Sequence, residues 1–377
     1  MLSRGDDYPL HQTPEPIAYA GTDRNFYDRY FFNGYAPDGS GFFAVAFGIY
    51  PHLNVADAHF CVIRDGVQHN LHASRELGME RMDLAVGPIR IEIVEPLQIL
   101  RVTVAGEGVS AELTFTGRAF PIEEPRFVHR IGPRTFMDYT RMTQNGRYAG
   151  WIEVDGKRQA LDPATCGTRD RSWGVRPVGA RDEQPHGTGV VPGFFWQWTP
   201  LNFADHSLFF HINADARGHA WNTRACIAPD GGSADSQFET SAAAMTASLA
   251  PGTRWPQAGV IDLMTPDGPD RITLEPAGRF QMRGLGYISP KWGHGLWHGA
   301  LEVEREDFAL GDCDPARMDN YHVQLPCHAT SERYGVGFGV FEQLILGPYA
   351  PLDLTGFADL GARAGCKKSE SPNPKSV

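Results

Sequence analysis

The chain has 377 residues and a formal net charge of -11, and this acidic balance argues against nucleic acid or an anionic membrane as the main partner. Its hydrophobic fraction of 42% with 21% charged residues is typical of a folded globular protein and excludes a largely disordered chain. No stretch approaches the roughly 18 apolar residues of a membrane-spanning helix, and the first residues lack the apolar core of a signal peptide. We therefore expect a cytoplasmic protein with no integral membrane segment.

The predicted elements are almost all strands. Short apolar or alternating runs are interrupted repeatedly by the 42 glycines and 28 prolines. In chain order, strands are predicted at 42–50, 89–93, 100–104, 111–115, 150–154, 194–198, 207–213, 296–304 and 335–346. The alanine-rich run 241–249 is compatible with either a helix or a strand. Asp-Gly or Asn-Gly pairs at 65–66, 145–146, 155–156 and 267–268 predict tight hairpin turns.

This pattern predicts an all-β protein with two tandem antiparallel β-barrel or sandwich domains. Chains above roughly 250–300 residues usually divide their core, and the absence of a repeat of 20–50 residues argues against propellers and solenoids. The polar stretch Val178–Pro192 is the best candidate boundary. We expect an N-terminal β domain at 1–180, a C-terminal β-barrel domain at 181–363 and a disordered tail at 364–377. The six scattered cysteines predict free thiols, most of them buried.

The most distinctive segment lies between Gly167 and Gly174. It contains Arg169, Asp170, Arg171, Ser172 and Trp173. In an extended strand, Asp170 and Ser172 face one side, while the two arginines and the tryptophan face the other. An acid and a hydroxyl then share one surface. The alternative interpretation is structural, with Asp170 held by an arginine and Trp173 filling core volume.

This segment, together with Asp28–Phe32, Phe47–Pro51 and Gly295–Gly299, resembles the AttH and carotenoid 1,2-hydratase-like group of lipocalin-like, or calycin, proteins. The resemblance spans residues 20–360, and the central run is its specific part. It implies two consecutive lipocalin-like β domains with a hydrophobic pocket in or between the barrels. The wider assemblage includes tocopherol-cyclase-like proteins and fungal pericyclases, whose shared theme is cofactor-independent chemistry on large apolar molecules.

Such chemistry needs a carboxylic acid that stays protonated in an apolar site, with aromatic faces that stabilise a cation. Asp170 is the leading candidate, because burial favours its protonated form, although contact with Arg169 or Arg171 would oppose this. His298 is a candidate base or proton shuttle, with a neutral structural histidine as the alternative. Glu342 lies in a strongly apolar strand, so it is either paired or functional.

Further side chains are candidates for contact with the substrate. They are Arg169, Ser172, Trp173, Trp196, Trp198, Trp297 and Tyr321. Ordinary β-core packing is the alternative for the tryptophans. With His322 and Tyr321 near Glu342 in sequence, the carboxyl-terminal half can supply a second acid–base group that faces the junction.

These observations predict a cofactor-independent lyase or isomerase, of hydratase, dehydratase or cyclase type. It is expected to act by acid–base catalysis on a large apolar substrate, a hydrophobic small molecule such as an isoprenoid, steroid-like or polyketide compound. The sequence contains no phosphate loop, metalloprotease helix or convincing dinucleotide fingerprint, so we expect neither a metal nor a cofactor. The main alternative is a non-catalytic intracellular lipid or isoprenoid carrier. A glycan-active β-sandwich fits the tryptophans but not an unexported chain.

Overall fold

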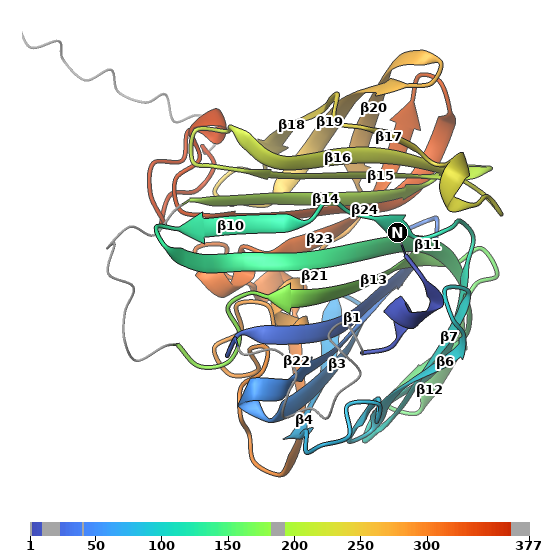
Figure 1. Ribbon diagram of the computed structural model, residues 1–377, viewed down its shortest axis with the longest axis vertical. Helices are drawn as coiled ribbons and strands as arrows, with labels where there is room; N and C mark the ends of the chain where they lie inside the picture. The colour runs from blue at the N-terminus through green and yellow to red at the C-terminus, as the bar shows by residue number, and fades with distance from the viewer. Residues whose placement is uncertain (1, 10–22, 40, 182–192, 363–377) are drawn as a thin grey trace, which may run out of the picture.

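The computed structural model describes residues 2–9, 23–39, 41–181 and 193–362. Within these residues the chain forms two antiparallel sheets, and the predicted all-β class with two lipocalin-like sheets is confirmed. Figure 1 shows the blue-to-green first sheet curling around one half of the molecule and the yellow-to-red second sheet around the other. Every described helix is a 3-10 turn of three or four residues, and none is long and apolar enough to span a bilayer.

The larger sheet has fourteen strands in the described part of the chain. They are β1 (Phe26–Tyr35), β2 (Phe42–Tyr50), β3 (Val55–Arg64), β4 (Val67–Glu76), β5 (Ala85–Val86), β6 (Ile89–Glu95), β7 (Ile99–Gly106), β8 (Val109–Gly117), β9 (Ile122–Glu123), β10 (Phe127–Ile131), β11 (Arg134–Val154), β12 (Lys157–Ala160), β13 (Cys166–Val175) and β22 (Leu301–Ala309). The order is β22-β4-β3-β2-β1-β13-β11-β8-β7-β6-β5, with β9, β10 and β12 paired to β11. The central strand β13, which carries the distinctive segment, therefore lies between β1 and β11.

The smaller sheet has ten described strands. They are β14 (Phe194–Asn202), β15 (His206–Ala214), β16 (Ala220–Pro229), β17 (Phe238–Thr240), β18 (Ala243–Leu249), β19 (Pro256–Thr265), β20 (Gly268–Pro276), β21 (Phe280–Gln281), β23 (Val323–Ser331) and β24 (Gly335–Leu346). The order is β17-β16-β15-β14-β24-β23-β20-β19-β18, with β21 paired to β23. The 3-10 turns are η1 (Arg4–Asp7), η3 (Pro51–Leu53), η4 (Ala234–Ser236), η5 (Met282–Leu285), η6 (Leu310–Asp312), η7 (Met318–Asn320) and η8 (Ala350–Leu352).

Two local predictions need correction, and one open choice is decided. The run 241–249, compatible with a helix or a strand, contributes strand β18. The strand predicted at 296–304 begins only at Leu301, and it pairs with β4 of the larger sheet. Asn145-Gly146 lies inside β11 rather than at a turn. A Cβ at Gly146 would lie 2.3 Å from the ring of Phe115, which explains why this position is a glycine. At that position glycine serves close packing between strands rather than chain reversal.

Domain limits of 1–180 and 181–363 remain a prediction. Residues 182–192 of the proposed boundary and the whole tail at 364–377, with Cys366, lie outside the described residues. The other five cysteines are buried free thiols.

Side chains of β1 point alternately into two separate hydrophobic clusters. Tyr30 and Phe32 pack into the apolar interior of the first sheet, whereas Tyr27 and Phe31 belong to a cluster that also contains Trp196 and Trp198 of β14. Strand β14 packs against β11 and β13. The second cluster therefore forms the junction between the sheets, and side chains on one face of β1, β11 and β13 meet side chains of the smaller sheet there.

The arginines of the central segment anchor the N-terminal segment. Arg169 forms a buried ion pair with Asp7, and its Nε donates to Gln144 Oε1 at 2.7 Å. Arg171 Nη1 donates to Asp28 Oδ1 at 2.5 Å, and its Nη2 donates to the carbonyl of Tyr8 at 3.0 Å. These two arginines thus hold residues 6–8 against the first sheet.

Candidate active site

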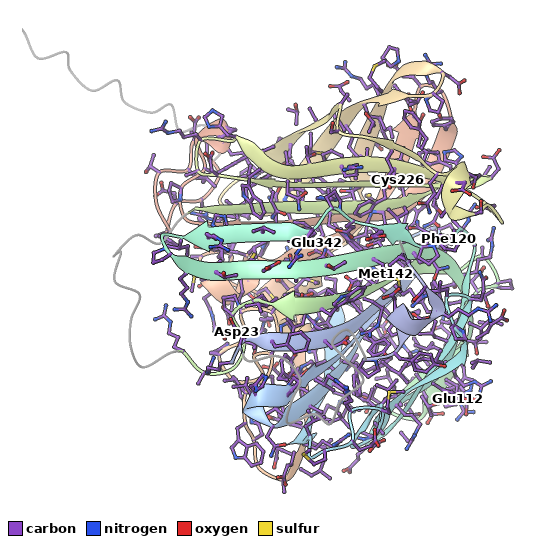
Figure 2. All side chains as sticks on the ribbon, viewed as in Figure 1. Asp23, Glu112, Phe120, Met142, Cys226 and Glu342 are labelled. Atoms are coloured by element: carbon purple, nitrogen blue, oxygen red, sulfur yellow. The ribbon has the colours of Figure 1, made fainter. Side chains whose placement is uncertain are left out.

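A cavity of about 110 Å³ lies at the junction of the two sheets. Its walls are Phe31, Met137, Tyr139, Arg141, Asp170, Arg176, Phe194, Trp196, Tyr287, His322, Glu342 and Leu344. Figure 2 shows the labelled Glu342 in the middle of the molecule, where the sheets meet. Apolar and aromatic walls with a few convergent charged groups are typical of a small-molecule site.

A wider hollow of about 410 Å³ lies at the rim of the first sheet. It is lined by Arg4, Thr116, Phe120 and the segment 95–99. Its lining contains one arginine, one glutamate and no histidine, whereas the junction cavity contains two acids, two arginines and a histidine. The side chains that acid–base catalysis needs therefore line the smaller, junction cavity.

Asp170 is 8% exposed and lines the junction cavity. It lies opposite Phe31 of β1 and Thr143 of β11, and its carboxyl group makes no hydrogen bond or ion pair among the described residues. Burial raises the pKa of Asp170 above its usual value, and this effect exceeds the opposing effect of the positive charges of Arg141, Arg29 and Arg176. The protonated form of Asp170 is therefore favoured more strongly in this cavity than in water.

Glu342 has the opposite environment in the same cavity. Burial raises its pKa, but the positive charge of His322 and hydrogen bonds from His322, Gln324 and Trp196 outweigh this, so that its pKa is lowered. Trp196 Nε1 donates to Glu342 Oε1 at 2.8 Å, and Gln324 Nε2 donates to Oε2 at 2.6 Å. Glu342 is therefore a stable carboxylate with its oxygens occupied.

His322 is oriented by Glu342. Its Nε2 lies 2.7 Å from Glu342 Oε1, so this nitrogen is the donor, and its buried Nδ1 has no hydrogen-bond partner among the described residues. The ring of Tyr287 packs edge-on against the imidazole, with 4.7 Å between ring centroids. When the imidazole is neutral, Nε2–H donates to Glu342 and Nδ1 can accept a proton; the imidazolium that then forms is the positive charge that lowers the pKa of Glu342.

Glu124 is a third buried acid, and it lies next to Arg141. Glu124 Oε1 accepts hydrogen bonds from Thr143 Oγ1 at 2.6 Å and Trp198 Nε1 at 3.3 Å, and Oε2 lies 3.9 Å from Arg141 Nη1 and 3.8 Å from His211 Nδ1. Burial raises the pKa of Glu124 to about 7, and burial lowers the pKa of His211 to about 3. Neutral His211 and mostly protonated Glu124 therefore coexist below neutral pH.

Glu124→Gln is expected to flatten the dependence of stability on pH. Because the pKa of Glu124 rises from 4.5 to about 7 on folding, the folded state holds a proton that the unfolded state releases in this window. Stability is therefore lost as pH rises from 4.5 to 7, by on the order of 3 kcal/mol for this group. Urea unfolding at pH 4.5, 5.5 and 7 measures the slope, with the exposed neighbour Glu123→Gln as the control. An unchanged slope in Glu124→Gln would refute the assignment.

The structure brings together three of the residues selected from sequence, namely Asp170, Glu342 and Trp196. Trp198 is buried next to them and packs edge-on against Phe31 at 6.0 Å. Ser172 is also buried, on the same strand as Asp170, but it does not line the cavity.

The other selected residues lie elsewhere. Arg169 is paired with Asp7, and Trp173 is half-buried near the end of β13. His298 stacks on Trp292 with 4.1 Å between ring centroids, and Trp297 is 56% exposed. Tyr321 is buried and its hydroxyl donates to the carbonyls of Ala316 and Phe357. None of these five side chains lines the junction cavity.

Several cavity residues were not selected from the sequence. Those with polar groups are Arg141, Arg176, Tyr139, Tyr287 and, as a site residue, His322. His211 and Glu124 lie directly behind the cavity wall. For His211 the sequence does contain a signal, because a histidine within the apolar strand Ser207–Asn213 has the same pattern that drew attention to Glu342.

Comparison with solved structures shows the fold. An AttH-like protein from Nitrosomonas europaea matches at 12% identity with a TM-score of 0.54, over 88% of this chain and 96% of that chain. CghA with Sch210972 matches at 11% identity with a TM-score of 0.50, over 85% and 88%. Kievitone hydratase from Nectria haematococca matches at 14% identity with a TM-score of 0.47, over 84% and 88%.

The resemblance to the AttH group expected from the central segment is thus confirmed, as a likeness of fold. No curated protein matches the sequence. A family model matches residues 2–357, and the chain belongs to the family of unknown function DUF8625.

Proposed function

We propose that the protein is a lyase or isomerase of the hydratase or cyclase type, which transfers protons to and from a small organic substrate in the junction cavity. Asp170 is the proton donor. His322 is the base, and Glu342 positions it. The observation that carries this proposal is that one cavity contains two carboxyl groups with opposite pKa shifts, raised for Asp170 and lowered for Glu342.

The proposed reaction begins with transfer of the Asp170 proton to an electron-rich carbon or carbonyl oxygen of the substrate, which leaves Asp170 as a carboxylate. The cation that forms is stabilised by the aromatic walls, which include Trp196, Tyr287 and Phe31. His322 Nδ1 then removes a proton, either from a water molecule that adds to the cation or from a neighbouring carbon. Return of that proton from His322 to Asp170 regenerates the enzyme, so no cofactor is consumed.

The side chains that line the cavity favour a catalytic function over ligand transport. Five acidic or basic side chains line it, namely Arg141, Asp170, Arg176, His322 and Glu342. A carrier of a purely apolar lipid would have to remove water from these groups without replacing their interactions, which costs free energy. The structure of CghA, which has the same fold and holds Sch210972, supports an organic small molecule as the ligand. A cytoplasmic location is compatible with this proposal.

Incubation in heavy water tests the proposal. The protein is mixed with isoprenoid polyenes, unsaturated ketones and their hydrates, and mass spectrometry measures deuterium bound to carbon. Incorporation above that of heat-denatured protein is the expected result, because the proton donated by Asp170 exchanges with solvent before transfer. A tightly retained ligand that remains unchanged and acquires no deuterium would instead support the carrier function.

A further inference from the structure

Two arginines beside the cavity, one buried and one partly buried, share one neutral histidine. Arg29 of β1 is 1% exposed, and Arg176 follows β13 directly. Arg29 Nη1 lies 3.5 Å and Arg176 Nη2 lies 3.1 Å from Nδ1 of His294, whose Nε2 donates to the carbonyl of Leu285 at 2.8 Å. Burial, with the charges of Arg29 and Arg176, keeps the pKa of His294 well below its usual value. The two guanidinium groups therefore converge on an uncharged acceptor.

These guanidinium groups have N–H donors without hydrogen-bond partners. Nε and Nη2 of Arg29 and Nε of Arg176 are buried without a hydrogen-bond partner, and no ion pair joins either arginine to a carboxylate within the described ranges. The arginines on the other face of β13 differ in this respect, because Arg169 pairs with Asp7 and Arg171 pairs with Asp28. Buried guanidinium N–H donors without a counter-ion or acceptor are costly, so the pair points to an anion that is supplied from outside the chain.

The pair is next to the cavity. Arg176 lines it, and Cζ of Arg29 and Cζ of Arg176 lie 4.6 Å and 5.7 Å from the centroid of the Tyr287 ring, which also lines it. The nearest acids do not neutralise the pair by direct contact. Asp57 accepts hydrogen bonds from Tyr50 and from the amide of Gly295, and Asp170 makes no ion pair in the described part of the structure.

We propose that Arg29 and Arg176 bind the carboxylate of the substrate, which is a small unsaturated or aromatic carboxylic acid whose apolar part packs against Phe31, Trp196 and Leu344. This inference rests on the proposed function for its use in catalysis, but not for binding itself. Guanidinium groups match a carboxylate in shape and supply paired N–H donors. A substrate carboxylate next to Asp170 also disfavours ionisation of Asp170, which keeps the proposed acid protonated when substrate is bound.

Benzoate and benzamide are suitable probes, since they have nearly the same shape and differ in charge. A cavity of about 150 Å³ holds benzene in another protein, so binding of either probe to a cavity of about 110 Å³ requires outward movement of its walls, equally for both probes. Isothermal titration calorimetry on the wild-type protein is expected to show at least about tenfold tighter binding of benzoate, equivalent to about 1.4 kcal/mol. Arg176→Gln and Arg29→Gln are each expected to remove this preference and leave benzamide affinity within about twofold.

Two controls keep the test decisive. Arg101→Gln changes an exposed arginine paired with Glu92 and should leave the preference intact. If the glutamine variants do not fold, Arg176→Lys retains the positive charge and should retain a reduced preference for benzoate. Equal binding of the probes to the wild-type protein, no binding of either, or an undiminished preference in the folded Arg29 and Arg176 variants would overturn the proposal.

Asp170→Asn separates this inference from the proposed function. The variant lacks the proposed acid but retains both arginines, so it should still prefer benzoate over benzamide. If the preference persists while the wild-type protein incorporates no deuterium, the anion site stands and the catalytic assignment fails. If deuterium is incorporated but benzoate is not preferred, the catalytic assignment stands and the anion site fails.

Discussion

Asp7→Ala is expected to lower the free energy of unfolding by about 3–5 kcal/mol, because it leaves a buried arginine without its counter-ion. Asp7 and Arg169 are both fully buried and form an ion pair. Asp7 Oδ2 also accepts a hydrogen bond from the amide of Leu97 at 2.5 Å. Loss of the carboxylate thus leaves both Arg169 and the buried amide of Leu97 without their partner. Urea unfolding at pH 7 measures the change.

A matched control and a rescue variant define the cause. Glu92→Gln removes an exposed ion pair with Arg101 and should cost less than about 1 kcal/mol. Asp7→Leu combined with Arg169→Met removes both charges and should recover at least half of the stability lost in Asp7→Leu, because no buried charge is then unpaired. Equal instability of the single and double variants would show that packing rather than charge dominates at this position.

Asp170→Asn is expected to reduce the rate of deuterium incorporation by about 100- to 10,000-fold, the range that general acid catalysis contributes. Asparagine has nearly the same shape but cannot donate a proton to carbon. Because the pKa of Asp170 is raised by burial, the folded state favours the protonated form, and ionisation above the unfolded-state pKa destabilises the protein. The variant should therefore be at least as stable as the wild-type protein at pH 7.

Rate and stability are measured on the same preparations, by mass spectrometry and by thermal unfolding. Glu153→Gln, which changes a half-buried acid paired with exposed Arg158 away from the cavity, should leave both unchanged. Full incorporation in Asp170→Asn would exclude Asp170 as the acid. Loss of activity together with a large fall in stability would assign Asp170 a structural role instead.

The strands were predictable from local sequence because alternation of side chains reports directly on a half-buried sheet. Strands β6, β7 and β8 have this alternation, and the predicted strand at 42–50 coincides with β2. Asn145-Gly146 was misread as a turn, because a glycine required for close packing has the same local signature as a glycine required for a turn. The position of β22 beside β4 is a long-range pairing, on which local pattern carries no information.

The candidate site was predictable only in part. Glu342 and Asp170 drew attention because acids in apolar or extended segments are unusual, and both line the cavity. Arg141 and Arg176 carry no such signal, since arginines are common at the edges of strands. His298 and Trp297 lie in an irregular segment before β22, so the strand alternation applied to them does not exist there.

The sequence by itself determined the all-β class, most of the strands, the alternation that turns Asp170 away from Arg169, and the fold family suggested by the central segment. These features depend on neighbours within a few residues of the chain. Tertiary structure alone decided which charges meet, namely that Arg169 pairs with Asp7, that Glu342 bonds to His322, and that Arg29 and Arg176 converge on His294. Whether a carboxyl group acts as a catalytic acid or as a structural ion-pair partner depends on its burial and on its neighbours. Both are set by strands that are far apart in the chain.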